Sequence, residues 1–183
     1  MRGRRGSQQC GMSKKVLKRH PKTTILTCTR AGASNVNACA LKATYRNFAP
    51  LVWLDGDIES NPRNYQRGKL MRLAQLQPSR VKIYKGMWLY LTRNVRKDVD
   101  YVNGMRAQVL AFNFRTRELR VRTQTKHVVA IYPWTDTDLG NHVYYPIRLG
   151  YASTIPKFQG AELPHVTLYL DAQKALASVE VRA

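Results

Sequence analysis

Between residues 81 and 133, apolar and polar side chains alternate with a period of two, the pattern of β-strands that bury one face. The alternation is clearest in four segments, residues 87–93, 106–112, 118–123 and 127–131. Asn103-Gly104 and residues 113–116 separate some of these segments, and both are typical turn sequences. Four or five short strands joined in this way predict a small β-barrel over residues 81–133.

The pattern differs on both sides of this region. Residues 23–30 form a β-branched run that predicts a buried strand. Residues 31–45 carry apolar side chains at helical spacing, with Ser34 or Gly32 near the cap; these apolar positions are Val36, Cys39, Ala40 and Ala43. Residues 146–152 and 166–170 predict two further buried strands, adjacent in one sheet. Strands that alternate with helical segments are typical of an α/β domain.

Residues 153–160 connect these last two strands and contain hydroxyl groups followed by Pro156, which suits the first position of a helix. A helix N-terminus offers unpaired backbone N–H groups and is a natural site for phosphate. Lys157 and Gln159 would stand beside those donors. An ordinary strand, turn and helix with solvated polar groups accounts for the same pattern, and the pattern alone leaves both interpretations open.

Composition narrows the choice of partner. The chain has 183 residues, 44% of them hydrophobic and 23% charged, which suits a globular domain with a proper core. Lys and Arg number 31 against 11 Asp and Glu, so the formal net charge is +20. That charge exceeds what solubility requires and predicts a polyanionic partner, nucleic acid first and an acidic membrane second. A merely solvated basic surface is the alternative.

The cysteines and the first residues bear on location. Cys10, Cys28 and Cys39 are odd in number and lack metal-ligand spacing, so we expect a reducing, intracellular compartment and no metal site. No run of 18 apolar residues predicts a membrane span. Residues 1–22 are basic and predict a flexible arm. Such an arm could be an organelle transit peptide, a nucleic-acid contact or the start of a truncated gene product, and nucleus and mitochondrion stay open as locations.

Three segments resemble one protein family. Residues 149–163, LGYASTIPKFQGAEL, are similar to the motif L-A-Y-A-x-T-I-H-K-S-Q-G-x-T-L of superfamily-one DNA helicases, in their Pif-one-like and RecD-like branch. Residues 25–41, ILTCTRAGASNVNACAL, resemble the segment that opens the second RecA-like domain of these enzymes. Residues 85–109, KGMWLYLTRNVRKDVDYVNGMRAQV, resemble a third family segment. The resemblance extends over residues 23–171 and implies the carboxyl-terminal half of such a helicase.

The resemblance implies roles for individual residues. In the first segment, Thr154 and Lys157 would face DNA, and a nucleotide would be bound by Gln159, Gly160 and Glu162. The family's His and Ser are replaced here by Pro156 and Phe158. In the second segment, Arg30 would sense a nucleotide phosphate or, alternatively, fix its own loop.

The third segment supplies cations and an aromatic side chain suited to phosphates and stacked bases. Its implied DNA-binding residues are Arg93, Asn94, Arg96, Lys97, Tyr101, Asn103 and Arg106. Solvated charges that keep strand edges from aggregating are the alternative interpretation.

Several parts of an ATP-hydrolysing motor are missing from the sequence. A phosphate-binding loop requires G-x-x-x-x-G-K-[ST], but the pair Gly68-Lys69 is followed by Leu70. There is also no Asp-Glu pair for a metal and its attacking water. Asp55 ends an apolar strand, and the following Gly56-Asp57 is better interpreted as a turn than as part of a metal site. The segment that carries the family's catalytic arginine is absent, so we assign no catalytic residue.

These observations predict a fold class and a function. The fold is expected to be α/β, a partial RecA-like second lobe of the P-loop NTPase type over residues 23–80 and 134–175, with an SH3-like β-barrel inserted at 81–133 and a tail at 176–183. The leading hypothesis is one half of an ATP-dependent 5′–3′ DNA helicase that binds single-stranded DNA and contributes one face of the ATP site.

On this hypothesis, ATP and Mg²⁺ serve the parent enzyme, and the missing amino-terminal RecA-like lobe is a partner. The chain alone would bind neither ATP nor Mg²⁺ and would be inactive. A non-catalytic nucleic-acid-binding module, for DNA or RNA, is the second hypothesis. A basic ribosomal or chromatin-type structural protein is the third.

Overall fold

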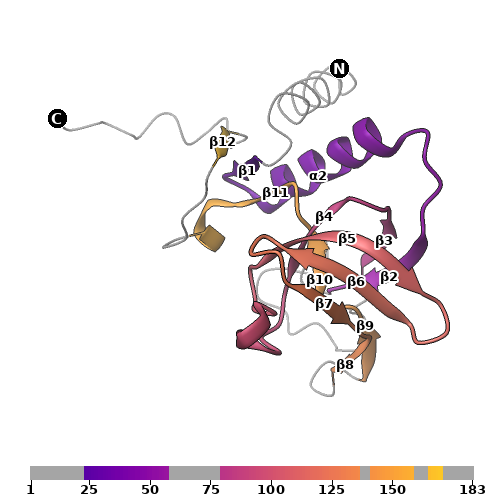
Figure 1. Cartoon of the computed structure of the whole chain (residues 1–183). Coiled ribbons are helices and arrows are strands. Elements are labelled where there is room, and N and C mark those ends of the chain that lie inside the picture. The colour runs from indigo at the N-terminus through magenta and orange to yellow at the C-terminus, as the bar shows by residue number, and fades with distance from the viewer. Residues whose placement is uncertain (1–22, 58–78, 137–140, 159–164, 171–183) are drawn as a thin grey trace. The chain divides into compact units, whose positions relative to one another are not determined.

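The computed structural model describes residues 23–57, 79–136, 141–158 and 165–170 (Figure 1). The chain divides after residues 46 and 150 into two compact units. Residues 1–46 and 151–183 belong to the first, which we call the flanking unit, and residues 47–150 form the second, which we call the central unit. These divisions differ from the predicted domain limits, because strands on either side of residues 81–133 also pair within the central unit.

The flanking unit is built on a three-stranded parallel sheet. Its strand order is β11-β1-β12, with bounds Ala152–Thr154, Thr24–Thr27 and Val166–Tyr169. All four residues of β1 are buried, as expected for a central parallel strand. A four-residue 3-10 helix, η5 (Ile155–Phe158), follows β11 directly, so the chain does turn into a helical segment at Pro156.

The prediction of one strand over residues 146–152 is wrong. The chain there forms β10 (Ile147–Leu149), which belongs to the central unit, and then β11. The break falls at Gly150, whose backbone N–H donates to the carbonyl of Trp88 at 2.8 Å. The two strands predicted to be neighbours are also separated, because β1 lies between β11 and β12.

Helix α2 (Arg30–Tyr45) follows β1, close to the predicted range. Its N-cap is Thr29, whose hydroxyl accepts from the backbone N–H of Gly32 at 3.0 Å, and not Ser34 or Gly32. Thr29 caps the helix because its extended backbone aims the hydroxyl at the first turn. Val36 and Ala40 are buried as predicted, and the intervening helix positions include one buried polar residue, Asn37.

Asn37 holds α2 on the sheet. Its side-chain amide donates to the carbonyl of Ala152 at 3.0 Å, and its oxygen accepts from the backbone N–H groups of Tyr151 and Ala152 at 3.1 and 2.9 Å. These three bonds satisfy the polar side chain that the helix buries. They also fix where β11 begins.

The central unit contains a five-stranded antiparallel sheet with strand order β10-β4-β5-β6-β7 (Figure 1). The bounds of the four consecutive strands are Trp88–Leu91 (β4), Arg106–Asn113 (β5), Glu118–Thr123 (β6) and Val128–Ile131 (β7). Each of the four segments predicted from the period of two therefore forms a strand. Their inward side chains make an apolar core that includes Leu89, Leu91, Val109, Leu119, Val121, Ile131 and Ile147.

Within the described residues, no ladder joins β7 to β10, so this sheet is open and the predicted closed barrel is not formed. Two antiparallel ribbons complete the unit. One pairs β2 (Val52–Gly56) with β3 (Ser79–Ile83), and the other pairs β8 (Trp134–Asp136) with β9 (His142–Tyr144). Asp55 lies within β2 as expected, and Gly56, predicted to begin a turn, is the last residue of that strand. The helical piece predicted near residues 70–76 lies outside the described residues.

Candidate nucleic-acid interface

Most of the predicted DNA-binding residues lie in one loop of the central unit, residues 92–105, between β4 and β5. The loop contains a short 3-10 helix, η4 (Lys97–Val99), which ends at Asp100 in the left-handed conformation with φ 56°. The backbone of Arg96 then pairs with that of Tyr101 in an isolated antiparallel bridge. Gly104, with φ +86°, turns the chain into β5. The loop is thus a folded hairpin on the sheet.

Two predicted residues shape this loop. The side-chain oxygen of Asn94 accepts from the backbone N–H of Asn103 at 2.8 Å and so closes the loop across its base. Tyr101 is only 6% exposed, and burial raises the pKa of its phenol to about 12. A buried ring offers no face to a nucleobase, so the predicted stacking by Tyr101 does not fit the structure. Asn94 and Asn103 themselves remain exposed.

The exposed cations of the loop are Arg96 and Lys97. Arg96 forms an ion pair with Asp98, its terminal nitrogen lying 2.6 Å from the carboxylate oxygen. Both side chains are more than 60% exposed, so water screens this pair and a phosphate could compete for the guanidinium. Arg96 and Lys97 are therefore presented in the way a phosphate contact requires.

Arg93 is half-buried and has two aromatic partners. Its guanidinium donates to the hydroxyl of Tyr144 at 2.7 Å, and its central carbon lies 5.6 Å from the ring centroid of Trp134. These contacts join the loop to the β8–β9 ribbon. Arg93 consequently has a structural role, and Trp134, which is 42% exposed, provides the aromatic surface that was expected from Tyr101.

The predicted DNA contact of Arg106 does not fit the structure, because this side chain is buried. It is 2% exposed, donates to the carbonyl of Gly150 at 2.9 Å, and lies over the ring of Trp88 at 4.5 Å. A guanidinium in this position is inaccessible to a DNA phosphate. Its role is to hold the start of β5 against the end of the β10 segment.

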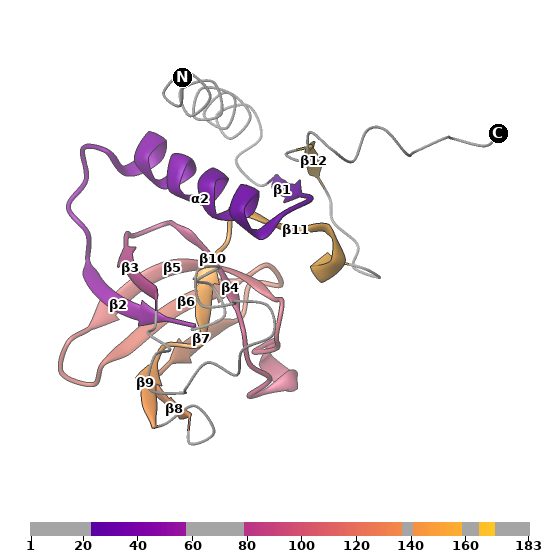
Figure 2. The same ribbon diagram turned by 180° about the vertical axis from the view of Figure 1, so that it is seen from behind.

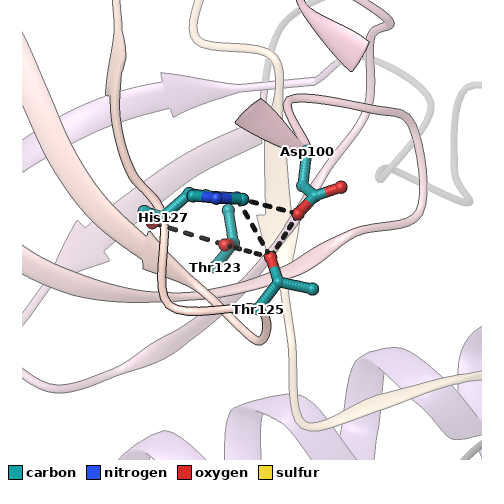
Figure 3. A network of polar contacts seen from close by, with 4 residues as sticks. All are labelled: Asp100, Thr123, Thr125 and His127. Carbon is teal, nitrogen blue, oxygen red and sulfur yellow. Dashed lines mark hydrogen bonds and ion pairs between the residues drawn. The ribbon is translucent and has the colours of Figure 1, made fainter. Parts of the chain in front are cut away.

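A polar network that the sequence did not reveal fastens the far side of the loop (Figure 3). The Thr125 hydroxyl donates to the carboxylate of Asp100, and His127 Nδ1 lies 3.0 Å from the same carboxylate oxygen. The hydroxyl of Thr123 lies 2.8 Å from that of Thr125. The hydrogen bonds from Thr125 and then His127 lower the pKa of Asp100 below its ordinary value, because both stabilise the ionised carboxylate.

The Asp, His and Thr side chains of this network do not form a nucleophilic triad. Activation of a hydroxyl requires the imidazole to take its proton while the opposite ring nitrogen faces the carboxylate. Here the Thr125 hydroxyl donates directly to Asp100, and Nδ1 of His127 faces both groups (Figure 3). The arrangement therefore connects the loop to the β6–β7 turn.

In the flanking unit, two predicted residues lie at one edge of the parallel sheet. Thr154 ends β11 and pairs with Thr27 at the end of β1, and Arg30 begins α2 two residues beyond Cys28. The carboxyl edge of a parallel α/β sheet is where ligands bind. Arg30 is exposed there, and Thr154 is half-buried.

The other predicted residues of this segment follow Thr154 in the chain. Lys157, predicted to face DNA, lies in η5, which directly follows Thr154. Gln159, Gly160 and Glu162 lie outside the described residues. The nucleotide-binding prediction for these three residues is therefore an expectation from sequence.

The described part of the chain lacks both a metal-binding cluster and a membrane-spanning helix. It contains no group of three or more His, Cys, Asp or Glu side chains that could hold a metal ion. None of its helices is long and apolar enough to cross a membrane.

Comparisons place the fold in a class. No family model and no curated protein sequence matches the chain. The chain does match solved structures of Pif1 helicases, which are DNA motors. The match covers 88–90% of the chain and so includes parts of both the parallel α/β unit and the antiparallel β unit. At 16–19% identity this likeness shows a shared fold.

Three structures illustrate the match. Pif1 helicase from Candida albicans is 16% identical, with 90% of this chain and 47% of that chain covered and a TM-score of 0.54. Pif1 from Bacteroides in complex with ADP-AlF3 and ssDNA is 19% identical, with 88% and 38% covered and a TM-score of 0.53. Bacteroides Pif1 bound to ssDNA is 19% identical, with 80% and 34% covered and a TM-score of 0.50. The chain thus spans between a third and a half of each helicase.

Proposed function

We propose that this chain is the carboxyl-terminal half of a Pif1-type, ATP-dependent 5′–3′ DNA helicase and that it binds single-stranded DNA. The observation that carries the proposal is the match, over 80–88% of the chain, to Pif1 helicases solved with ssDNA or with ADP-AlF3 and ssDNA. The open five-stranded sheet of the central unit would correspond to the SH3-like module expected from the sequence.

The charge of the chain supports DNA as the ligand. A net charge of +20 attracts a phosphate backbone, and each phosphate contact to a single strand releases counterions and steepens the salt dependence by about 0.7 in log K against log [salt]. Arg96 and Lys97 in the central unit are exposed for such contacts. Arg30 and Thr154 lie at the carboxyl edge of the flanking sheet, the edge at which α/β folds in general bind ligands, and this supports the proposal.

ATP and Mg²⁺ belong to the parent enzyme in this proposal. The phosphate loop and the Asp-Glu pair that would hold them are absent from the 183 residues, so transferring a phosphoryl group would lack its charge stabilisation. An amino-terminal RecA-like lobe would supply both. The chain alone should therefore bind DNA without turning over ATP.

The test measures both properties in the full chain. Fluorescence anisotropy with labelled oligo-dT should show binding that weakens steeply with salt, and a coupled assay should show negligible ATPase activity. Arg96→Gln combined with Lys97→Gln should weaken binding and lower the salt slope by about 1.4 for two lost phosphate contacts. Arg115→Gln with Arg117→Gln, two exposed cations of the β5–β6 turn, is the matched control. Salt-independent binding or robust ATP turnover would refute the proposal.

A non-catalytic nucleic-acid-binding module is the second candidate. The exposed cations Arg96 and Lys97 lie entirely within the central unit, which favours a module that works without the flanking unit. Arg30→Ala and Thr154→Ala discriminate the two candidates. Under the helicase proposal both should weaken oligo-dT binding, whereas under the module hypothesis neither should matter and RNA should compete with DNA.

A further inference from the structure

The β2–β3 ribbon presents an unusual outer face. Its side chains alternate, so that Leu54, Val81 and Ile83 are buried beneath the ribbon. The opposite face points to solvent and combines one large aromatic ring with charges. Its exposed residues are Trp53, Asp55, Arg80 and Lys82.

The ribbon is held along the β2 edge. Its two strands pair at five positions, and the backbone N–H of Leu51 donates to Ile83 at 2.7 Å and so extends the ladder. Along the β2 edge, the carbonyl of Asp55 accepts from Tyr145 at 2.7 Å, and the N–H of Asp57 donates to Ile147 at 3.1 Å. Its outer face is therefore a fixed surface.

Trp53 is the centre of this face. It is 48% exposed and pairs directly with Lys82 across the ladder. The ammonium of Lys82 lies 4.6 Å from the ring centroid, and the guanidinium carbon of Arg80 lies 5.6 Å from it. Cation–π contacts at exposed sites are weak, so they do not account for keeping so large a ring half in water.

We propose that this face, which we call the Trp53 platform, is a second contact surface for single-stranded nucleic acid. A base stacks on the exposed part of the Trp53 ring, and the neighbouring phosphates meet Arg80 and Lys82. The inference deepens the proposed function and rests on it. In Figures 1 and 2 the β2–β3 ribbon lies on the side of the central unit opposite to the 3-10 helix of the 92–105 loop, so the platform is separate from the loop cations.

The chemistry of the platform favours a nucleic acid over a protein. A stable protein interface needs a broad surface with an apolar core, and this face has a single large apolar side chain. Stacking of one base needs only one ring, and cations that already flank the ring lie where the phosphates of that nucleotide pass. Asp55 lies opposite Arg80 in the ladder, and its negative charge repels a phosphate. Removing that charge should therefore strengthen nucleic-acid binding, whereas removing Trp53, Arg80 or Lys82 should weaken it.

The experiment compares variants of the full chain by anisotropy with oligo-dT and with the same backbone lacking bases. Trp53→Ala should weaken oligo-dT binding roughly 5- to 150-fold, the range for loss of one base–aromatic stack. It should leave binding of the abasic strand almost unchanged. Trp53→Phe should restore much of the affinity. Arg80→Gln with Lys82→Gln should weaken both strands and reduce the salt slope, and Asp55→Asn should strengthen both.

Controls separate this inference from the proposed function and from misfolding. Phe114→Ala removes an exposed aromatic ring that has no cation against it in the described contacts, and it should change neither affinity. If the unaltered chain fails to bind oligo-dT, the proposed function fails. If the chain binds but Trp53→Ala has no effect, or weakens the two strands equally while circular dichroism stays native, the platform is refuted.

Discussion

Gly150 and Gly104 are both required to be glycine, but for different physical reasons. A Cβ atom on Gly150 would lie 2.7 Å from the backbone nitrogen of Leu89 and 2.8 Å from the carbonyl carbon of Trp88. Backbone atoms of a central strand cannot move aside. Gly104 has φ +86° and open space around it, so only its conformation excludes most side chains.

The two sites should therefore respond differently to the same substitution. Gly150→Ala should lower the free energy of unfolding by about 1–3 kcal/mol, because it overpacks the sheet. Gly104→Ala should cost about 1 kcal/mol, and Gly104→Asn less, because Asn tolerates the left-handed region. Urea titration followed by circular dichroism measures both. A loss for Gly104→Asn as large as that for Gly104→Ala, or a Gly150→Ala variant as stable as the unaltered chain, would contradict this distinction.

At the same scale, sequence alone could not separate one arginine from another. Arg96 and Arg106 belong to the same family-like segment and were predicted to do the same work. The structure exposes Arg96 and buries Arg106, whose guanidinium lies over Trp88 and donates to the carbonyl of Gly150. Gly150 lies 44 residues away in the sequence, so local spacing carried no information about this hydrogen bond.

Among the elements, the 92–105 loop is notable because it is fastened at two separate points. Asn94 closes its base, and Asp100 joins it to the β6–β7 turn through Thr125 and His127 (Figure 3). A loop with two such ties presents Arg96 and Lys97 in a restricted geometry. The loop then loses less conformational entropy when a phosphate binds.

The Asp100 tie has a definite dependence on pH. The pKa of Asp100 is lower in the folded chain than its ordinary value of 3.8. The network therefore stabilises the loop at pH values above that ordinary value, and this contribution is lost as the pH falls through the lower, folded-state pKa. Thr125→Val removes the hydroxyl that contributes most, so the pKa of Asp100 should rise.

NMR tests this prediction through the carboxyl ¹³C chemical shifts of the chain. They are measured from about pH 2 to about pH 6, a range set around the ordinary carboxyl pKa. Asp98 is the internal control, since its pKa is lowered chiefly by Arg96 and should not respond to Thr125→Val. An unchanged Asp100 titration in that variant would show that the hydroxyl does not tie the loop.

Elements were predictable where the pattern was local. The period of two located β4 to β7 because the pattern lies within the sequence of each strand. In β6, Arg120 and Arg122 are exposed between buried neighbours, whereas in β4 Leu89, Tyr90 and Leu91 are all buried. The ribbons β2–β3 and β8–β9 were missed as pairs, since their partners are chosen across intervening residues. The break at Gly150 was missed because Ile147, Leu149, Tyr151 and Ala152 form one mainly apolar run in the sequence, although the residues before and after Gly150 belong to different sheets.

At the scale of the whole molecule, the two units differ in how their chain is assembled. The central unit is one continuous segment, residues 47–150, and contains its own apolar core. The flanking unit needs residues from both sides of it. Continuity and a core are what an independently folding domain requires.

A fragment of residues 47–150 should therefore fold alone, with a cooperative urea transition in circular dichroism. A fragment that stops at residue 146 is the matched control. It lacks β10, and with it Ile147, which is completely buried against the sheet, so it should lose cooperative unfolding. A gradual, non-cooperative transition of the longer fragment would show that the central unit depends on the flanking one.

The position of β1 between β11 and β12 also determines the order of events during synthesis. Thr24–Thr27 leaves the ribosome before the central unit, and both of its neighbours follow residue 150. At translation rates of about 5–20 residues per second, roughly 7–28 s pass before the partner strands exist. The nascent chain must therefore carry a β-branched strand with two open edges while the central unit is completed, and that interval is when chaperones would be needed most.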